Sequence, residues 1–128
     1  MSERGEISIT FMSGPKDGEI LKFEQPPAGQ ERVLTIGRRE TCDVYLPNDN
    51  QVSRLHARLG CQSKKITETD VTSLPFLLDF WLEDGGSRNG TYVEKLPDRI
   101  TRRVSLRPGS LFRIGRTWLR LDVPMSFG

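Results

Sequence analysis

The chain has 128 residues, of which 28% are charged and 35% are hydrophobic, and its net charge is +2. This length predicts one domain whose core is large enough to fold without a metal or a disulfide. The small net charge gives no argument for a nucleic-acid or membrane partner, and no apolar run is long enough to span a bilayer. Because residues 1–6 contain no apolar stretch, we predict no signal peptide and a cytoplasmic location.

Apolar and polar residues alternate in several short segments, a period of two that predicts β-strands. Clear examples are residues 7–11, 55–59, 76–83 and 119–123. In the second of these, the alternation puts Leu55 on the apolar face. Twelve glycines and eight prolines separate the segments and leave no long helical pattern. About ten short, mostly antiparallel strands result, which is typical of an all-β sandwich or barrel.

Polar residues whose side chains can donate hydrogen bonds lie where predicted strands meet loops. Gly37-Arg38 ends one strand, Ser53-Arg54 precedes another, and residues 87–90 link two more. In a sandwich the loops gather at the two ends, so these three could share one end. A phosphate monoester would suit such a site, because guanidinium groups and a hydroxyl donate to its oxygens. Within the site, the candidate residues are Arg38, Ser53, Arg54, Arg88 and Asn89.

Five motifs in a fixed order make this interpretation specific: GR (37–38), CDVYL (42–46), VSRLHA (52–57), SRNGT (87–91) and LRPG (106–109). Together they resemble the forkhead-associated (FHA) domain. The resemblance implies a sandwich of two packed, mostly antiparallel sheets with the binding loops at one end. It also implies a flexible N-terminus at 1–6, the domain at 7–123 and a tail at 124–128.

The function implied by this resemblance is recognition of phosphothreonine on partner proteins in Ser/Thr-kinase signalling, without catalysis or cofactor. Arg38 would bind phosphate oxygens, and Ser53 would donate its hydroxyl to the same group. Arg54 and Arg88 would make further contacts with the phosphate. Asn89 would hydrogen-bond the peptide backbone on either side of the phosphothreonine.

The remaining motif residues are expected to shape the loops. The resemblance implies that His56 braces them without touching the ligand, and that Ser87 and Thr91 staple them. Gly37 is expected at a close approach of two backbones, and Gly90 at a positive φ. The Asn89-Gly90 pair is also expected to form a turn, and type I′ is the commonest turn for this pair.

The sequence gives little support for a metal site or for acid–base catalysis. The chain has only Cys42, Cys61 and one histidine, so no metal site is expected, and the redox state of the cysteines stays open. The carboxylates of Asp79, Glu83 and Asp84 have no nucleophile or histidine nearby in the sequence. We therefore interpret them as surface residues.

Two other classes of function stay open. A nucleic-acid binder would need aromatic side chains for stacking, which are not evident beside the arginines. Such a binder could use Arg38, Arg39, Arg54, Arg58 and Arg88. A phosphate-independent scaffold could use an exposed sheet face with Trp81 and Leu77. Thr67 and Thr69, in acidic surroundings, are further candidate phosphorylation sites.

Overall fold

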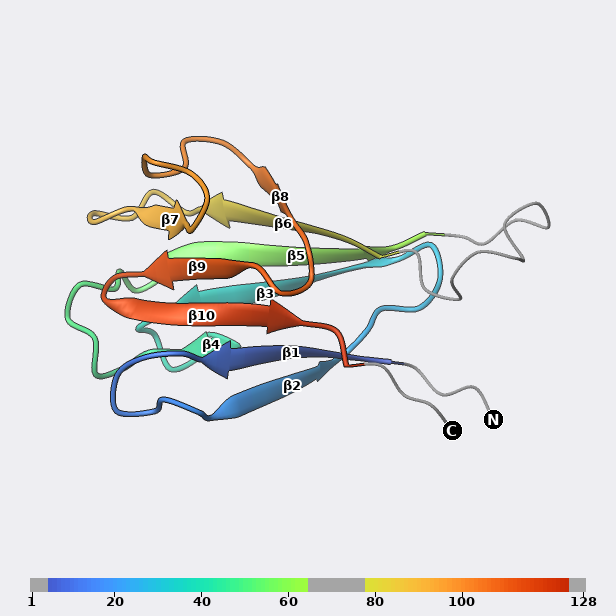
Figure 1. Cartoon of the computed structure of the whole chain (residues 1–128), viewed down its shortest axis with the longest axis horizontal. Helices are drawn as coiled ribbons and strands as arrows, with labels where there is room; N and C mark the ends of the chain where they lie inside the picture. Colours follow the sequence, from blue (N-terminus) through green and yellow to red (C-terminus); the bar gives the residue numbers. More distant parts are fainter. Residues whose placement is uncertain (1–4, 65–77, 125–128) are drawn as a thin grey trace.

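The computed structural model describes residues 5–64 and 78–124, and within these it has ten strands in two sheets (Figure 1). The strands are β1 (Glu6–Phe11), β2 (Ile20–Glu24), β3 (Glu31–Gly37), β4 (Val44–Tyr45), β5 (Ala57–Ser63), β6 (Leu78–Asp84), β7 (Thr91–Val93), β8 (Val104–Leu106), β9 (Leu111–Ile114) and β10 (Thr117–Asp122). No helix long and apolar enough to span a membrane occurs in the part of the chain that the structure describes.

The two sheets have five strands each, in the orders β2-β1-β10-β9-β7 and β4-β3-β5-β6-β8. All neighbouring strands run antiparallel except β3 and β4, which run parallel. The predicted all-β sandwich of two mostly antiparallel sheets is therefore confirmed.

One hydrophobic core lies between the sheets. It combines inward side chains of both sheets, such as Ile9 and Leu119 from one and Ile36 and Leu59 from the other. Each of these four is at most 1% exposed. Burial of about twenty such side chains holds the sandwich together and gives the loops a rigid support.

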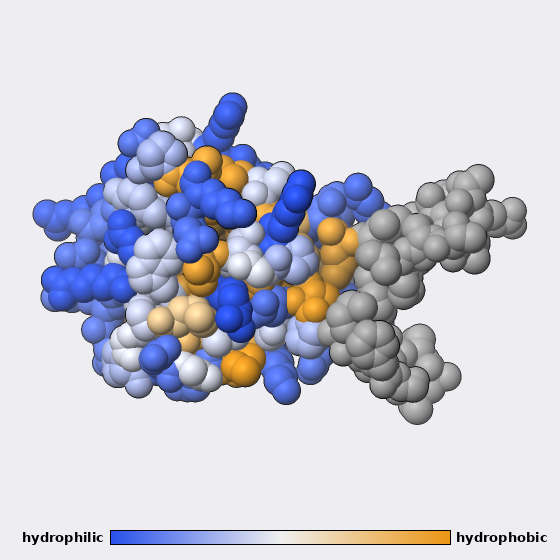
Figure 2. All heavy atoms as spheres, in the orientation of Figure 1, coloured by the Kyte–Doolittle hydropathy of each residue, from blue (hydrophilic) through white to orange (hydrophobic). Residues whose placement is uncertain are grey.

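Strand directions bring the candidate loops to one end of the sandwich. Because β3 pairs antiparallel with β5, and β5 with β6, the end of β3, the start of β5 and the end of β6 coincide. The loops 38–43, 46–56 and 85–90 therefore lie together, at the left of Figure 1. Hydrophilic residues crowd the same end in the space-filling view (Figure 2).

The structure corrects one detail of the alternation. Leu55 is 50% exposed and His56 is fully buried, the reverse of the expected pattern. The chain turns at residues 54–55 and β5 begins only at Ala57, so the period of two does not yet apply. The predicted strand residues 76–77 and the candidate phosphorylation sites Thr67 and Thr69 lie outside the described residues.

Both cysteines are free and buried in the core region. Burial raises the pKa of the Cys61 thiol to about 12, so this thiol stays protonated at neutral pH.

Candidate functional site

The loop of residues 46–56 lies between the other two candidate loops. On one side, the backbone N–H of Arg38 donates to Ser53 O at 3.1 Å, and that of Arg39 donates to Arg54 O at 3.2 Å. On the other side, the backbone N–H of Arg88 donates to Ser53 Oγ at 3.1 Å. The structure thus brings Arg38, Ser53, Arg54 and Arg88 together from three segments that are far apart in the sequence.

The polar side chains at this junction are held in defined orientations. Arg38 Nε–H donates to Val52 O at 3.1 Å, and Asn89 Nδ2 donates to Gln51 O at 2.9 Å. No contact among residues 5–64 and 78–124 uses the two Nη groups of Arg38 or the Oδ1 of Asn89. Because Ser53 Oγ accepts from Arg88, its own hydroxyl hydrogen stays available for a further acceptor.

His56 connects two of the loops from inside the protein. Its Nδ1 accepts the backbone N–H of Ser53 at 3.0 Å, and its Nε2 lies 2.8 Å from Gly90 O. A carbonyl oxygen can only accept, so Nε2 carries the proton and the ring is neutral. Burial lowers the pKa of His56, and the hydrogen bond to Gly90 only partly offsets this. Both ring nitrogens are therefore engaged in holding the loops.

Asp84 organises the loop of residues 85–90. Its carboxylate accepts the backbone N–H groups of Gly86 and Ser87 at 2.9 Å each, the Ser87 hydroxyl at 2.5 Å and the Thr91 hydroxyl at 2.7 Å. Ser87 Oγ in turn accepts the N–H of Gly90 at 2.9 Å. The interpretation of Asp84 as a plain surface residue is therefore wrong.

The other two carboxylates of that group do face outward, since Glu83 pairs with Arg58 and Asp79 with Lys64.

The pKa of Asp84 predicts a specific dependence of stability on pH. Burial alone would raise this pKa, but the hydrogen bonds from Ser87, Thr91 and Gly86 outweigh burial and lower it. A carboxyl whose pKa is lower in the folded than in the unfolded chain stabilises the fold above the unfolded value of about 4. That contribution is lost as the pH falls through the folded pKa.

We therefore expect Asp84→Asn to reduce the free energy of unfolding by about 1–2 kcal/mol at pH 7, and by clearly less at pH 3. Urea denaturation of both proteins at the two pH values measures this difference. An Asp84→Asn effect of equal size at pH 7 and pH 3 would show that the charged carboxylate does not support the loop.

Two glycines meet backbone requirements in this site. A Cβ on Gly37 would lie 2.1 Å from Arg54 O, so only glycine allows loops 38–43 and 46–56 to approach so closely. Gly90 has a φ of 88°. Asn89-Gly90 does not form a type I′ hairpin, because Asn89 lacks the required positive φ and β6 and β7 belong to different sheets.

The electrostatics of this end favour an anion. Asp84 is occupied by the donors described above, and Asp43 accepts the backbone N–H and hydroxyl hydrogen bonds of Thr35. The arginines of the three loops are exposed. Arg99, which the motifs did not single out, adds a guanidinium whose Nη2 donates to Ser87 O at 3.0 Å. Together with Arg99, the arginines of the three loops number five, against the four carboxylates of Glu40, Asp43, Asp49 and Asp84. The charge around the junction is therefore slightly positive.

The three loops lie within the part of the chain that the model of one known protein family matches. The model of the FHA domain matches residues 34–115, more than half of the chain, and this range contains every candidate residue. The chain belongs to the FHA family. The matched range begins in β3 and ends just after β9, so it covers the three loops of the site and the strands that support them.

Solved FHA domains share the fold. The FHA domain of CT664 from Chlamydia trachomatis is 21% identical, with a TM-score of 0.62, and the match covers 91% of this chain and 96% of that one. The FHA domain of an Arabidopsis thaliana hypothetical protein is 19% identical, with a TM-score of 0.68 and coverages of 100% and 96%.

The yeast Dun1 FHA domain was solved in complex with a doubly phosphorylated peptide derived from Rad53. It is 22% identical, with a TM-score of 0.67 and coverages of 100% and 81%. No curated protein sequence matches the chain. At these identities the solved structures establish the common fold.

Proposed function

We propose that this FHA domain binds phosphothreonine segments of partner proteins at Arg38, Ser53, Arg54, Arg88 and Asn89. One observation carries the proposal: at a junction of three loops, Arg38 is hydrogen-bonded to Val52 and Ser53 while its Nη groups and the hydroxyl hydrogen of Ser53 stay unused among the described residues. The phosphorylated peptide bound to the similar Dun1 domain supports it. A role in Ser/Thr-kinase signalling, a cytoplasmic location and domain bounds of 7–123 remain predictions.

Each residue has a distinct part in this binding. The Arg38 fork takes two phosphate oxygens and the Ser53 hydroxyl takes the third. Arg54 and Arg88 balance a charge of about −1.5 to −2 at pH 7. Asn89, fixed by Gln51, presents its Oδ1 to a backbone N–H of the ligand. We assign no catalytic step, because the histidine of the site is neutral, buried and engaged at both nitrogens.

The two alternatives are less well supported. A nucleic-acid site would draw on Arg58, but this residue forms a 2.7 Å ion pair with Glu83 on β6, which already balances its charge. A scaffold face would draw on Trp81, whose indole donates to a carboxylate at 2.8 Å. The guanidinium of Arg103 also covers this indole, 3.6 Å from the ring centroid. The second scaffold residue, Leu77, lies outside the described residues.

We expect phosphothreonine to be preferred over phosphoserine. FHA domains generally hold the threonine methyl in a small apolar niche, as the family resemblance implies for this chain. Burial of one methyl contributes about 0.8 kcal/mol, which corresponds to about a fourfold preference, and conformational selection would add to it. Calorimetric titration with two peptides that differ only in this methyl measures the preference, and equal affinities would contradict it.

An oriented phosphothreonine peptide library tests the proposed function without any assumption about the partner's sequence. The protein should retain a defined subset of the phosphopeptides and release them after phosphatase treatment. Retention of the same peptides before and after dephosphorylation would instead favour the scaffold alternative.

A further inference from the structure

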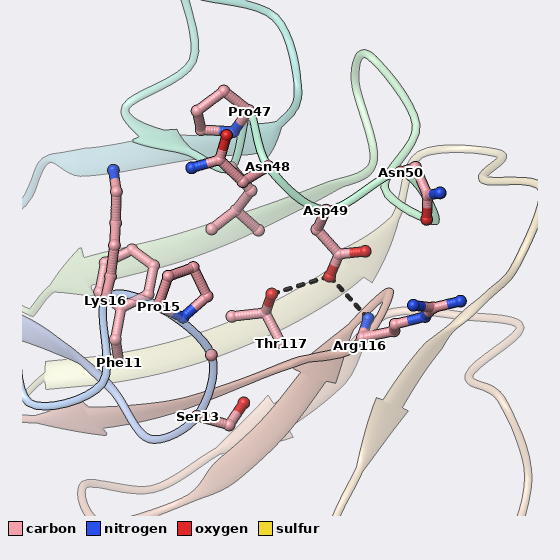
Figure 3. A pocket seen from close by; sticks show the side chains of 12 residues that line it. Phe11, Ser13, Pro15, Lys16, Pro47, Asn48, Asp49, Asn50, Arg116 and Thr117 are labelled. Carbon is pink, nitrogen blue, oxygen red and sulfur yellow. Dashed lines mark hydrogen bonds between the residues drawn. The ribbon is translucent and has the colours of Figure 1, made fainter.

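A cavity of about 250 Å³ (Figure 3) opens at the end of the sandwich that also carries the candidate site, at the left of Figure 1. Three segments enclose it: the β1–β2 loop, the first half of the β4–β5 loop and the β9–β10 turn. Its apolar wall is formed by Phe11, Pro15, Leu46 and Pro47. None of the five proposed ligand-binding residues lines this cavity.

The cavity and the candidate phosphate site share one loop. Residues 46–50 line the cavity, and Ser53 lies three residues further along the same loop. Pro47 and Ser53 are six residues apart in the chain, so they are separated by at most about 20 Å, and the turn between them shortens this distance. An extended ligand advances about 3.3 Å per residue. It would therefore reach the cavity within about six residues of a bound phosphothreonine.

Hydrogen bonds hold the cavity open in a fixed shape. Asp49 Oδ2 accepts the backbone N–H of Arg116 at 2.7 Å and the hydroxyl of Thr117 at 2.8 Å. Its Oδ1 accepts the backbone N–H of Gln51 at 3.0 Å. The β4–β5 loop is thus tied to the β9–β10 turn, and Figure 3 shows the two bonds to that turn. A preformed cavity requires little ordering when a ligand binds.

The rim of the cavity is positive. Asp49 is the one carboxylate among the residues that line the cavity, and both its oxygens are engaged. Lys16 stands at one side, with its Nζ 5.7 Å from the centroid of the Phe11 ring. The exposed Arg116 stands at the other side (Figure 3). An apolar wall between two cations fits an apolar side chain next to an acidic one.

We propose that this cavity binds an apolar side chain of the phosphorylated partner, within about six residues of the phosphothreonine, with an adjacent acidic residue facing Lys16 or Arg116. This inference rests on the proposed function, because the phosphothreonine sets the distance. The cavity would make the domain select partners by a segment remote from the phosphate.

Calorimetry with phosphothreonine peptides that differ at one pair of positions tests the inference. The pair is Leu-Asp, Leu-Lys or Ala-Ala, placed in turn two, three, four, five and six residues before and after the phosphothreonine. At the placement that reaches the cavity, we expect the Leu-Asp peptide to bind about tenfold tighter than the Ala-Ala peptide. The Leu-Lys peptide should bind more weakly than the Leu-Asp peptide there.

A Lys16→Glu/Arg116→Glu double variant should reverse the order of Leu-Asp and Leu-Lys. A Lys22→Glu/Arg107→Glu double variant has the same change of charge away from the cavity and should keep the order. If all three peptides bind the wild-type protein equally in every placement, yet need the phosphate, the inference is wrong and the proposed function stands. If binding does not need the phosphate, both are wrong.

Discussion

Replacing Arg38 with alanine is expected to weaken the binding of a phosphothreonine peptide at least tenfold to a hundredfold while the protein stays folded. The change removes a charge-assisted fork in which each hydrogen bond contributes about 1.5–3 kcal/mol. The fold should survive because Arg38 is exposed and its side chain makes one hydrogen bond, to Val52 O. Calorimetry gives the affinity, and thermal unfolding reports the fold.

Arg39→Ala provides the matched control for this experiment. Arg39 is the next residue, is exposed, and enters the loop contacts through its backbone N–H and carbonyl groups. Its removal changes the net charge equally but should lower the affinity less than about threefold, as expected for a screened surface charge. Unchanged affinity of a folded Arg38→Ala protein would refute the assignment of Arg38 to the phosphate.

Gly37→Ala is expected to lower the free energy of unfolding by about 3 kcal/mol and to abolish peptide binding. The added Cβ would lie 2.1 Å from Arg54 O and 2.9 Å from its carbonyl carbon. These are backbone atoms, so no side-chain rotation can relieve the overlap. Loops 38–43 and 46–56 would have to separate, which would pull Arg38 away from Ser53.

Gly85→Ala separates this effect from a general effect of a methyl group near the site. A Cβ on Gly85 would lie 3.2 Å from Leu55 O, so the Leu55 carbonyl must shift only slightly to admit it. We expect this variant to lose less than about 1 kcal/mol and to bind the peptide normally. Urea denaturation and peptide titration of both variants provide the comparison. A Gly37→Ala protein as stable as Gly85→Ala would show that the loops tolerate separation.

Local sequence patterns predicted about ten short strands, whereas the common end of the three loops followed from the expected sandwich and the family resemblance. The alternation of Ile7, Ile9 and Phe11, for example, corresponds to β1 with all three side chains buried. Such a pattern reports which face a side chain takes within a strand. It could not show that the chain still turns at Leu55, where the buried ring of His56 accepts the N–H of Ser53 and donates to Gly90 O in another loop.

The supporting residues of the site were predictable only where their contacts are local. Asp84 bonds to residues two to seven positions ahead, and the Asp-Gly-Gly-Ser run at 84–87 is a turn signature that could have indicated this. Asp49 bonds instead to Arg116 and Thr117, 67 and 68 residues away. No local pattern reveals such partners, because only the folded sandwich brings them together.

The most direct measurement for the central claim is calorimetric titration of one library-selected peptide in two forms, with phosphothreonine and with threonine at the same position. A site built from Arg38, Ser53 and the neighbouring arginines depends on the phosphate for most of its contacts. We predict that removal of the phosphate weakens binding at least a hundredfold, about 2.7 kcal/mol. Equal affinities for the two forms would contradict the account.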